Sequence, residues 1–498
     1  MTPNLLVLLS LLGLLFPVGA VLWAASANRD AETPPYGLYV LTAVALGVTG
    51  SLITGFGLQF GGVAGLYPAL GELSGLGDHW TPLAKALGSG WALAGASGFF
   101  LAVGDDPGAY ALFVFQVSLM MVALSLMAIT CAGRNRPLTF AFLVVLFAWL
   151  VYPLAGGWTW GGGWLSTLGQ TKDLGHGLVD FGGAGVVHLS AGVVALAGAF
   201  VWGRLPGPTA TVLPAEGAEP ARANEEGMAG AVPTEDAPTQ AEEVVAAQGT
   251  APVVALTGAV AAPSPSLLET PETGPTPLGA AGALAMGLGW LALLAGSAVL
   301  TGASLPAVVV NGLVAGAAGC AAALGYMGFT TGRSHGAMGA RGLVAGLVAI
   351  SAGAPFVSPA AAFVIGAVAG LLVCVATHVV AQSLRLDDPL AVISVHGVGG
   401  LWGLLAVGVF AHGRVGAGWN GVGIKEYLGV ASQGVTGLLP AGGLAADPGQ
   451  MQAQLIGALA ISALVLVSTW LLFMLTRRPD FALPEGEPGV SAAEQAEA

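Results

Sequence analysis

The chain has 498 residues, of which 55% are hydrophobic and only 8% are charged, and its formal net charge is −13. A soluble domain carries about 25% charged residues, so this composition excludes a soluble globular protein and indicates a membrane protein. The 79 glycines fit helices that approach one another closely in lipid, and the three cysteines lie in apolar runs that indicate no disulfide framework.

Eleven apolar stretches are long enough to cross a bilayer as helices. The predicted spans are residues 4–26, 37–58, 109–132, 137–156, 179–203, 278–300, 304–330, 339–356, 360–383, 389–412 and 452–475. The first lacks a basic segment before its apolar run, which favours a retained helix over a signal peptide. The stretch 88–103 is short and rich in glycine, and it is predicted to lie in an outer loop.

Lysine and arginine positions predict the orientation of the spans. With eleven spans and the N-terminus outside, ten of the 14 basic residues lie in inner loops or the tail and four in outer loops. The positive-inside rule expects this distribution. Counting 88–103 as a span would place nine of the inner arginines outside.

One motif occurs twice. Asp180 precedes His188 by eight residues, and Asp388 precedes His396 by eight residues, each time within an apolar stretch. Eight helical residues rise about 12 Å, which places both imidazoles near the middle of the bilayer. An ionisable side chain there is costly and is a functional candidate by default. The two aspartates are predicted to cap their helix starts.

The other histidines have no such motif. Four of them lie in loops or at span ends and are predicted to be solvated: His79, His176, His335 and His412. His378 lies near the inner end of its span and is predicted to be a packing residue.

The topology relates the two motifs. Five spans separate them, an odd number, so spans 1–5 and 6–10 are predicted to be inverted repeats with the functional site at their interface near the midplane. The predicted architecture is therefore an all-α polytopic membrane protein. Its parts are the first repeat (1–203), a linker (204–277), the second repeat (278–412), an outer loop with the last helix (413–476) and an inner tail (477–498).

The linker differs from the rest of the chain. It is acidic and rich in Ala and Pro, and ten of the 27 acidic residues lie in it. Such a composition cannot bury enough apolar surface to offset its ordering entropy, so a disordered cytoplasmic linker is predicted.

Four segments resemble the ammonium transporter, methylammonium permease and Rhesus family: DFGGAGVVHLSAGVVAL, the WGGGW run at 160–164, GWLALLAGS at 289–297 and LDDPLAVISVHGVGGLWG at 386–403. The resemblance implies eleven helices with a pore in each subunit of a homotrimer. It implies a multi-pass protein of the plasma membrane that recognises ammonium, ammonia or methylammonium and binds no nucleic acid. The tail loosely resembles the family segment that meets the PII signalling protein.

The resemblance also implies roles for single residues. His188 and His396 resemble the pore histidines that share a hydrogen bond and relay a proton. Trp160 resembles the tryptophan over the outer recruitment site, where a cation can stack on the ring. In the same site, Phe115 resembles an aromatic wall, Ser297 the serine that bonds the ion and Asp180 the aspartate that supports the site from below.

Two positions depart from the family pattern. Leu119 and Leu293 stand where the family stacks two phenylalanines as a gate, which keeps the constriction apolar but removes its aromatic faces. Transport is the favoured function, and an ammonium sensor, a non-conducting regulatory paralogue or a channel for another small neutral gas are the alternatives. No nucleophile motif, metal cluster or cofactor motif is visible, so neither an enzyme nor a bound cofactor is predicted.

Overall fold

The computed structural model describes residues 2–27, 35–88, 90–203, 277–333 and 335–476. The predicted disordered linker (204–277, apart from Pro277) and the predicted inner tail (477–498) lie outside the described residues. Within the described residues, ten helices or directly continued helix segments are long and apolar enough to cross a membrane. In chain order they are α1 with α2 (Thr2–Gly13, Leu15–Ala27), α3 with η1 and α4 (Tyr36–Gly50, Ser51–Gly55, Phe56–Phe60), α6 (Pro107–Cys131), α7 with η4 and α8 (Pro137–Leu146, Phe147–Val151, Tyr152–Thr159), η5 with α10 (Ala184–Leu189, Ser190–Trp202), α11 (Pro277–Thr301), α12 (Leu305–Thr331), α14 with η6 (Pro359–His378, Val379–Ser383), η7 with η8 and α15 (Pro389–Ala391, Val392–Gly397, Val398–Phe410) and α16 (Pro448–Thr476).

The predicted eighth span is shorter than its apolar composition suggests. Helix α13 (Gly336–Ile350) ends six residues before the predicted limit of 356, and residues 351–357 form buried turns. The amide of Asn311 donates to the carbonyls of Ala354 and Val357, and these bonds replace helical ones. The helix can therefore end here, because the Asn311 side chain on α12 supplies hydrogen bonds to carbonyl groups of the turn.

Local sequence explains several helix starts. The Asp106 carboxylate accepts from the Gly108 and Ala109 amides, and Pro107 occupies the first turn of α6. Ser358 caps α14 in the same way, again followed by a proline. A short polar cap before proline satisfies orphan amides at a position where proline loses no hydrogen bond.

The loops that the structure describes hold only short elements. They are η2 (Pro68–Leu70), β1 (His79–Trp80), α5 (Ala84–Leu87), β2 (Ala94–Gly95), η3 (Phe99–Leu101), α9 (Leu168–Lys172), η9 (Trp419–Gly421), β3 (Glu426–Tyr427) and β4 (Val430–Ala431). Strand β1 pairs antiparallel with β2, and β3 with β4. The stretch 88–103 thus lies in a loop, as predicted.

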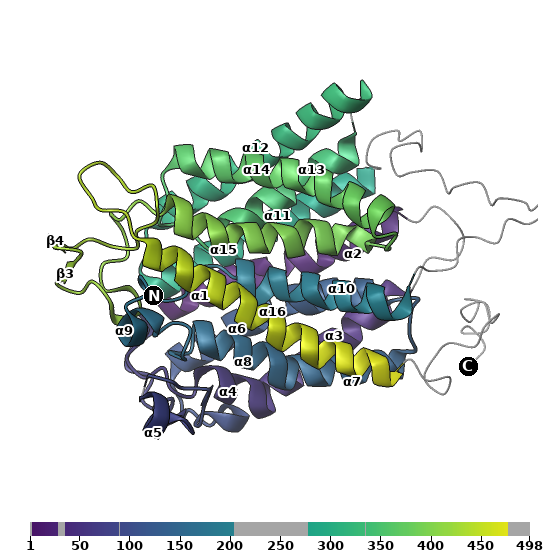
Figure 1. Cartoon of the computed structure of the whole chain (residues 1–498). Coiled ribbons are helices and arrows are strands. Elements are labelled where there is room, and N and C mark those ends of the chain that lie inside the picture. The colour runs from purple at the N-terminus through teal and green to yellow at the C-terminus, as the bar shows by residue number, and fades with distance from the viewer. Residues whose placement is uncertain (1, 28–34, 89, 204–276, 334, 477–498) are drawn as a thin grey trace, which may run out of the picture. The chain divides into compact units, whose positions relative to one another are not determined.

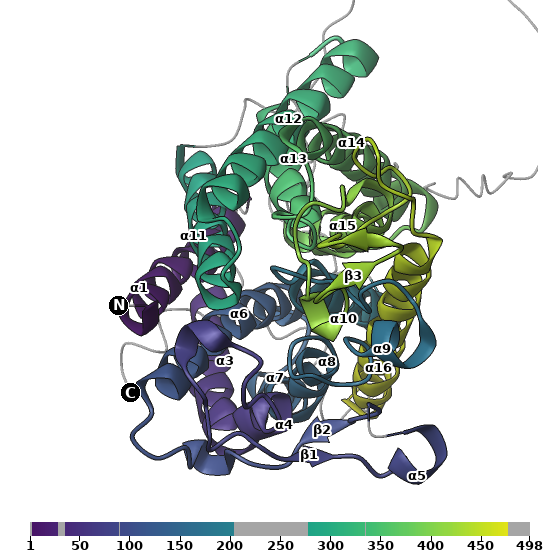
Figure 2. The ribbon, with the colours of Figure 1, turned by 90° about the vertical axis from the view of Figure 1, so that its left-hand side faces the viewer.

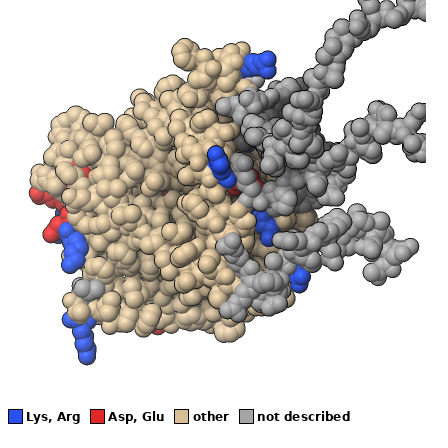
Figure 3. Space-filling model, turned by 45° about the vertical axis from the view of Figure 1, so that its right-hand side comes forward, with Lys and Arg blue, Asp and Glu red and all other residues tan. Residues whose placement is uncertain are grey.

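The long helices run side by side, and β3, β4, α5 and α9 lie at one end of them (Figure 1). Seen from that end, α11–α14 lie on one side, α3, α4, α7 and α8 lie on the other, and α6, α10 and α15 lie between them (Figure 2). Charged side chains gather toward the two ends of the helices, and the surface between them is almost entirely uncharged on the face in Figure 3. The protein is a multi-pass membrane protein.

Candidate functional site

The two histidines of the repeated motif meet in the interior. The Nδ1 atoms of His188 and His396 lie 3.0 Å apart, and their rings stack at 4.9 Å between centroids. Both side chains are buried, at 0% and 1% exposure. The sequence spacing predicted both residues, and the structure brings them into hydrogen-bond contact.

Two aromatic side chains enclose the histidine pair. The Phe16 ring centroid lies 6.1 Å from that of His188 and 6.0 Å from that of His396. The Trp290 ring lies 4.1 Å from His188, and its Nε1 donates to Ser351 Oγ rather than to a histidine. Sequence reasoning gave neither residue a role. Phe16 lies in an apolar helix with nothing to distinguish it, and Trp290 lies in the segment GWLALLAGS, in which only Leu293 and Ser297 were assigned to the site.

Each histidine sits in a π-helical turn that an aspartate caps. Asp180 Oδ2 accepts from the Gly185 and Val186 amides at 3.0 and 2.9 Å. At the second motif, Asp388 Oδ1 accepts from Ile393 N at 2.8 Å and Oδ2 accepts from Ser394 N at 2.9 Å. In both motifs the carboxylate therefore binds the amides five and six residues after it. Such π turns are rare and occur often at functional sites.

The residue before each π turn has a left-handed backbone. Gly183 has φ +90° and Ala391 has φ +54°. A Cβ on Gly183 would meet Val187 at 2.7 Å, so glycine is required by space as well as by conformation. Ala391 adopts the same region without that freedom, which is strained backbone at a candidate functional site.

Glycines let the two histidine segments touch. A Cβ on Gly192, four residues after His188, would lie 2.2 Å from the Cα of Gly397. A Cβ on Gly400, four residues after His396, would lie 2.4 Å from the carbonyl oxygen of Ala184. That Cβ would also lie 2.7 Å from the nitrogen of Leu189, which follows His188 as Gly397 follows His396. Each glycine thus packs against the residue that follows the other histidine. A glycine four residues after each histidine is the sequence signal that could have revealed this crossing.

The two segments run in opposite directions. At the end opposite the strands, the Arg134 guanidinium donates to the carbonyl oxygens of Gly203 at 3.0 Å and Asp387 at 3.5 Å. Arg134 therefore joins the last turn of α10 to the loop that starts the second histidine segment. At the strand end, Asn420 after α15 donates to the carbonyl of His176 before α10.

The residues predicted for the outer site form two separate contacts. Trp160 Nε1 donates to the carbonyl oxygen of Asp180 at 2.6 Å. Phe115 is 1% exposed and would meet a Cβ on Gly296, the neighbour of Ser297, at 2.6 Å. Asp180 faces the start of its own π turn, where its carboxylate is used as a cap.

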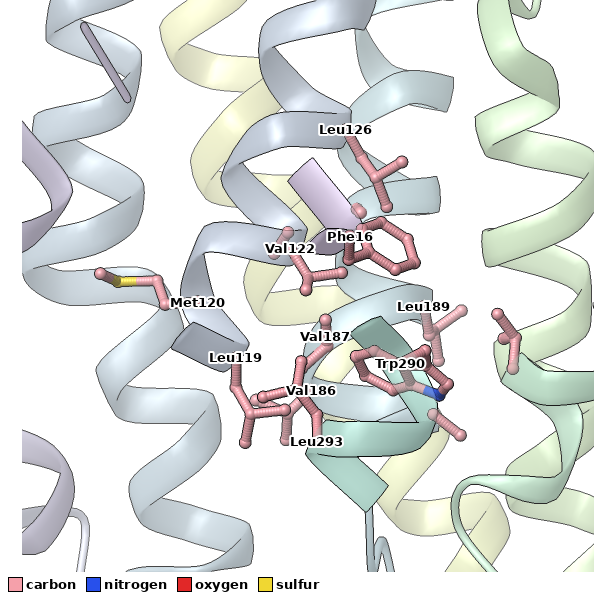
Figure 4. Close-up of a cluster of buried hydrophobic side chains, with 14 of the residues drawn as sticks. Phe16, Leu119, Met120, Val122, Leu126, Val186, Val187, Leu189, Trp290 and Leu293 are labelled. Carbon is pink, nitrogen blue, oxygen red and sulfur yellow. The ribbon is translucent and has the colours of Figure 1, made fainter. Parts of the chain in front are cut away.

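The predicted gate positions lie in one buried apolar cluster with Val186, Val187, Phe16 and Trp290 (Figure 4). Leu119 is 2% exposed and Leu293 is 0% exposed. A Cβ on Gly13 would lie 2.4 Å from Leu293 Cδ2, so α1 presses directly on this leucine.

His176, predicted to be a solvated loop residue, is fully buried, and that prediction was wrong. Its ring packs edge-on at 4.6 Å against Tyr427, whose hydroxyl donates to Asp447. Burial lowers the pKa of His176 to about 4, so this imidazole is neutral near pH 7. His335 is also buried, at 6% exposure, although it too was predicted to be solvated. His378, predicted to pack inside, is exposed on α14.

Two glutamines of α16 hold the segment before the first histidine helix. Gln450 accepts from the His176 amide and donates to the Gly177 carbonyl, each at 2.9 Å. Gln454 accepts from the Val179 amide at 2.9 Å and donates to the carbonyls of Val179 at 2.8 Å and Leu404 at 2.9 Å. Sequence reasoning missed both glutamines, because they lie about 270 residues away from their partners.

Known proteins resemble this chain in sequence. The ammonium transporter Amt2 of Archaeoglobus fulgidus is 27% identical over 338 residues, which are 67% of this chain and 61% of that protein. The ammonium transporter of Bacillus subtilis is 28% identical over 316 residues, 62% of this chain and 61% of that protein. The chain thus spans about 61% of the length of these curated relatives.

Solved structures share the fold. Mep2 of Saccharomyces cerevisiae superimposes with a TM-score of 0.68 at 21% identity, covering 99% of this chain and 90% of that one. A sensor Amt protein gives a TM-score of 0.68 at 21% identity, covering 99% of this chain and 98% of that one.

The family comparison covers both halves of the chain. The model of the Ammonium Transporter Family matches residues 4–212 and 269–479, which include both aspartate–histidine motifs. The chain therefore belongs to the Ammonium Transporter Family.

Proposed function

We propose that the protein recruits ammonium at the end that carries the strands and conducts ammonia through an apolar pore lined by His188 and His396. The observation that carries the proposal is the buried imidazole pair, bonded through Nδ1 atoms 3.0 Å apart amid apolar side chains. An ammonium ion cannot cross an apolar passage without a large desolvation cost. A histidine is the side chain whose charge changes most readily near neutral pH, so the pair can relay the proton while ammonia passes separately.

The recruitment site is proposed to contain Trp160, Phe115, Ser297 and Asp180. Support comes from the Trp160–Asp180 hydrogen bond and from Phe115 packing beside the backbone next to Ser297. Leu119 and Leu293 are proposed to form the constriction below it. With leucines in place of aromatic rings, this constriction excludes hydrated ions by its apolar character alone.

The protein is proposed to lie in the plasma membrane with its N-terminus outside and its C-terminus inside. Residues 1–203 and 278–412 are the two inverted repeats, 204–277 is the cytoplasmic linker, 413–476 adds the outer loop and last helix, and 477–498 is the cytoplasmic tail. Opposite directions of the two histidine segments support this arrangement. Labelling of single cysteines from one side of sealed vesicles, placed at residues 85 and 478, tests it.

Assembly as a homotrimer, with PII contacting the inner face, rests on the family resemblance. Light scattering of the purified protein in detergent, corrected for bound detergent, gives the number of chains. Binding of purified PII to immobilised protein, with and without residues 477–498, tests the second contact.

The transport proposal is tested in proteoliposomes given a pulse of ammonium or methylammonium. We expect an ammonium-dependent current or internal pH change above that of empty liposomes. If neither a current nor a pH change exceeds that of empty liposomes, the transport function is excluded, and an ammonium sensor or a non-conducting regulatory paralogue is favoured. A pH change that is carried without current and is matched by other small gases would favour a neutral-gas channel.

A further inference from the structure

A second buried polar site lies apart from the histidine pair, among η1, α4, α6 and α8. Its polar lining consists of Ser51, Gln59, Gln116 and Tyr152, and Phe56 and Phe113 add apolar walls. The cavity measures about 10 Å³. A single water molecule needs roughly 10–15 Å³ on this scale, so the space accepts one molecule of that size.

The hydrogen-bond groups around the cavity are only partly used. Gln59 Nε2 donates to Gln116 Oε1 at 3.1 Å, which leaves each amide with a second polar group. The Tyr152 side chain is 1% exposed, and its hydroxyl makes no hydrogen bond within the described part of the chain. Tyr152 is one of the residues that line the cavity. A buried hydroxyl without a partner costs about 1–3 kcal/mol, so a molecule bound in the cavity is expected to supply that partner.

Two π turns border this space. η1 begins at Ser51, η4 ends at the residue before Tyr152, and the two turns contact each other. A π turn widens the helix by one residue and displaces the backbone from ideal packing. Gly156 lets α8 approach the amides, because a Cβ there would lie 2.3 Å from Gln59 Nε2.

The lining of the cavity contains no charged side chain. Asp180 acts electrostatically on Tyr152, but its carboxylate does not line the cavity and accepts from the amides of its own π turn. An ion in the cavity would therefore lose its hydration without a counter-charge in the lining, whereas a neutral molecule that both donates and accepts hydrogen bonds loses little. We infer that the cavity binds one small neutral molecule of the water or ammonia type, held by the Tyr152 hydroxyl and the Gln59–Gln116 amide pair.

The bound molecule lies against residues that are neighbours in sequence of the proposed recruitment site and gate. Gln116 follows Phe115 directly and precedes Leu119 by three residues on α6, while Tyr152 lies on the helix that ends beside Trp160. The molecule thus links α6 to α8 and fixes the spacing of these residues. Its binding does not depend on whether the protein conducts ammonium.

A structure of the full chain at a resolution that shows ordered water tests the site, determined once in ammonium-free buffer and once with an ammonium salt. We expect one density peak within hydrogen-bond distance of Tyr152 Oη. A peak in both conditions assigns water, and a peak only with the ammonium salt assigns ammonia. No peak in either condition overturns the inference.

The Tyr152→Phe variant removes a single oxygen and should lose this peak while the histidine pair keeps its geometry. Tyr326→Phe, on α12 and 37% exposed, is the matched control and should retain the peak. Persistence of the peak at its original place in Tyr152→Phe contradicts the role of the hydroxyl. If Tyr152→Phe does not yield folded protein, Gln116→Met carries the same test with the same expected loss.

Discussion

The Nδ1 atoms of His188 and His396 lie 3.0 Å apart, so one ring donates a hydrogen to the other and the two must be different tautomers. The donor ring then has an unprotonated Nε2, and the acceptor ring has a protonated Nε2. His188 Nε2 is buried without a hydrogen bond among the described residues, which leaves it free to exchange a proton with a passing molecule. In the proposed relay, the donor ring gains a proton at its Nε2, the shared hydrogen passes to the acceptor ring, and the acceptor ring releases the proton from its own Nε2. The two neutral rings then have exchanged tautomers.

Replacing either histidine with leucine should abolish ammonium-dependent current, since one ring alone leaves no polar path between the apolar walls. His188→Leu and His396→Leu should behave alike, and the double variant should lose little more than either single one, because the residues act as a unit. His378→Leu, at an exposed position of α14, should remain active. Unchanged current and potassium selectivity in either pore variant, measured in proteoliposomes, would rule out the relay.

Rebuilding the aromatic gate with Leu119→Phe and Leu293→Phe should slow flux or sharpen selectivity over potassium. Because α1 presses on Leu293 through Gly13, the larger ring should also lower the free energy of unfolding by about 1–3 kcal/mol. Leu288→Phe, on α11 and 61% exposed, is the control and should change neither property. A double variant with the original rate and selectivity would show that these positions do not border the pore.

Alanine at Gly192 or Gly400 should separate the two histidine segments. The added Cβ would lie 2.2 Å or 2.4 Å from backbone atoms that no side-chain rotation can move. We expect a lower melting temperature together with loss of current, because the 3.0 Å contact between the rings would open. Gly328→Ala, where a Cβ meets nothing within 4 Å, should leave both measurements unchanged. Full current in Gly192→Ala would show that the crossing does not control the pair.

Asparagine should be tolerated better at 180 than at 388. At Asp180 a single oxygen accepts both amides, so the asparagine oxygen can replace it. At Asp388 each oxygen accepts a different amide, and the NH2 of asparagine would face one of these donors. Thermal unfolding should show a loss of about 0.5–2 kcal/mol for Asp388→Asn and a smaller loss for Asp180→Asn. The reverse order would contradict the assignment of the caps.

Acid should destabilise the loop that holds His176. The ordinary pKa of histidine is about 6.5, and burial lowers the pKa of His176 to about 4. Between these two values the unfolded chain binds a proton at His176 and the folded chain does not. The contribution of neutral His176 to the free energy of unfolding is fully present above pH 6.5. It is lost as the pH falls toward 4, by at most about 1.4 kcal/mol per pH unit. Melting temperatures of His176→Leu should therefore fall less between pH 7 and pH 5 than those of the wild type, whereas His378→Leu should follow the wild type. Parallel curves for all three proteins would exclude this linkage.

The aspartate–histidine spacing identified the central pair because depth in a membrane helix follows directly from residue count. The π turns were not predictable, since the five-residue hydrogen bonds around His188 depend on packing against α15 rather than on local propensity. The early end of α13 likewise depends on Asn311, which a reading of apolar length cannot include. His176 was wrongly predicted to be solvated, because the residues that bury it lie at 420–450, far along the chain.

The glutamines of α16 have a consequence for biosynthesis. The ribosome makes the backbone of residues 176–179 long before Gln450 and Gln454, which later satisfy it. Until α16 is inserted, those amides and carbonyls must find other partners at the membrane surface. A nascent chain released after Phe410 would thus contain both histidines but lack the two glutamines that bind the backbone of residues 176–179, just before the first histidine helix. We expect quality-control proteases to recognise that exposed segment.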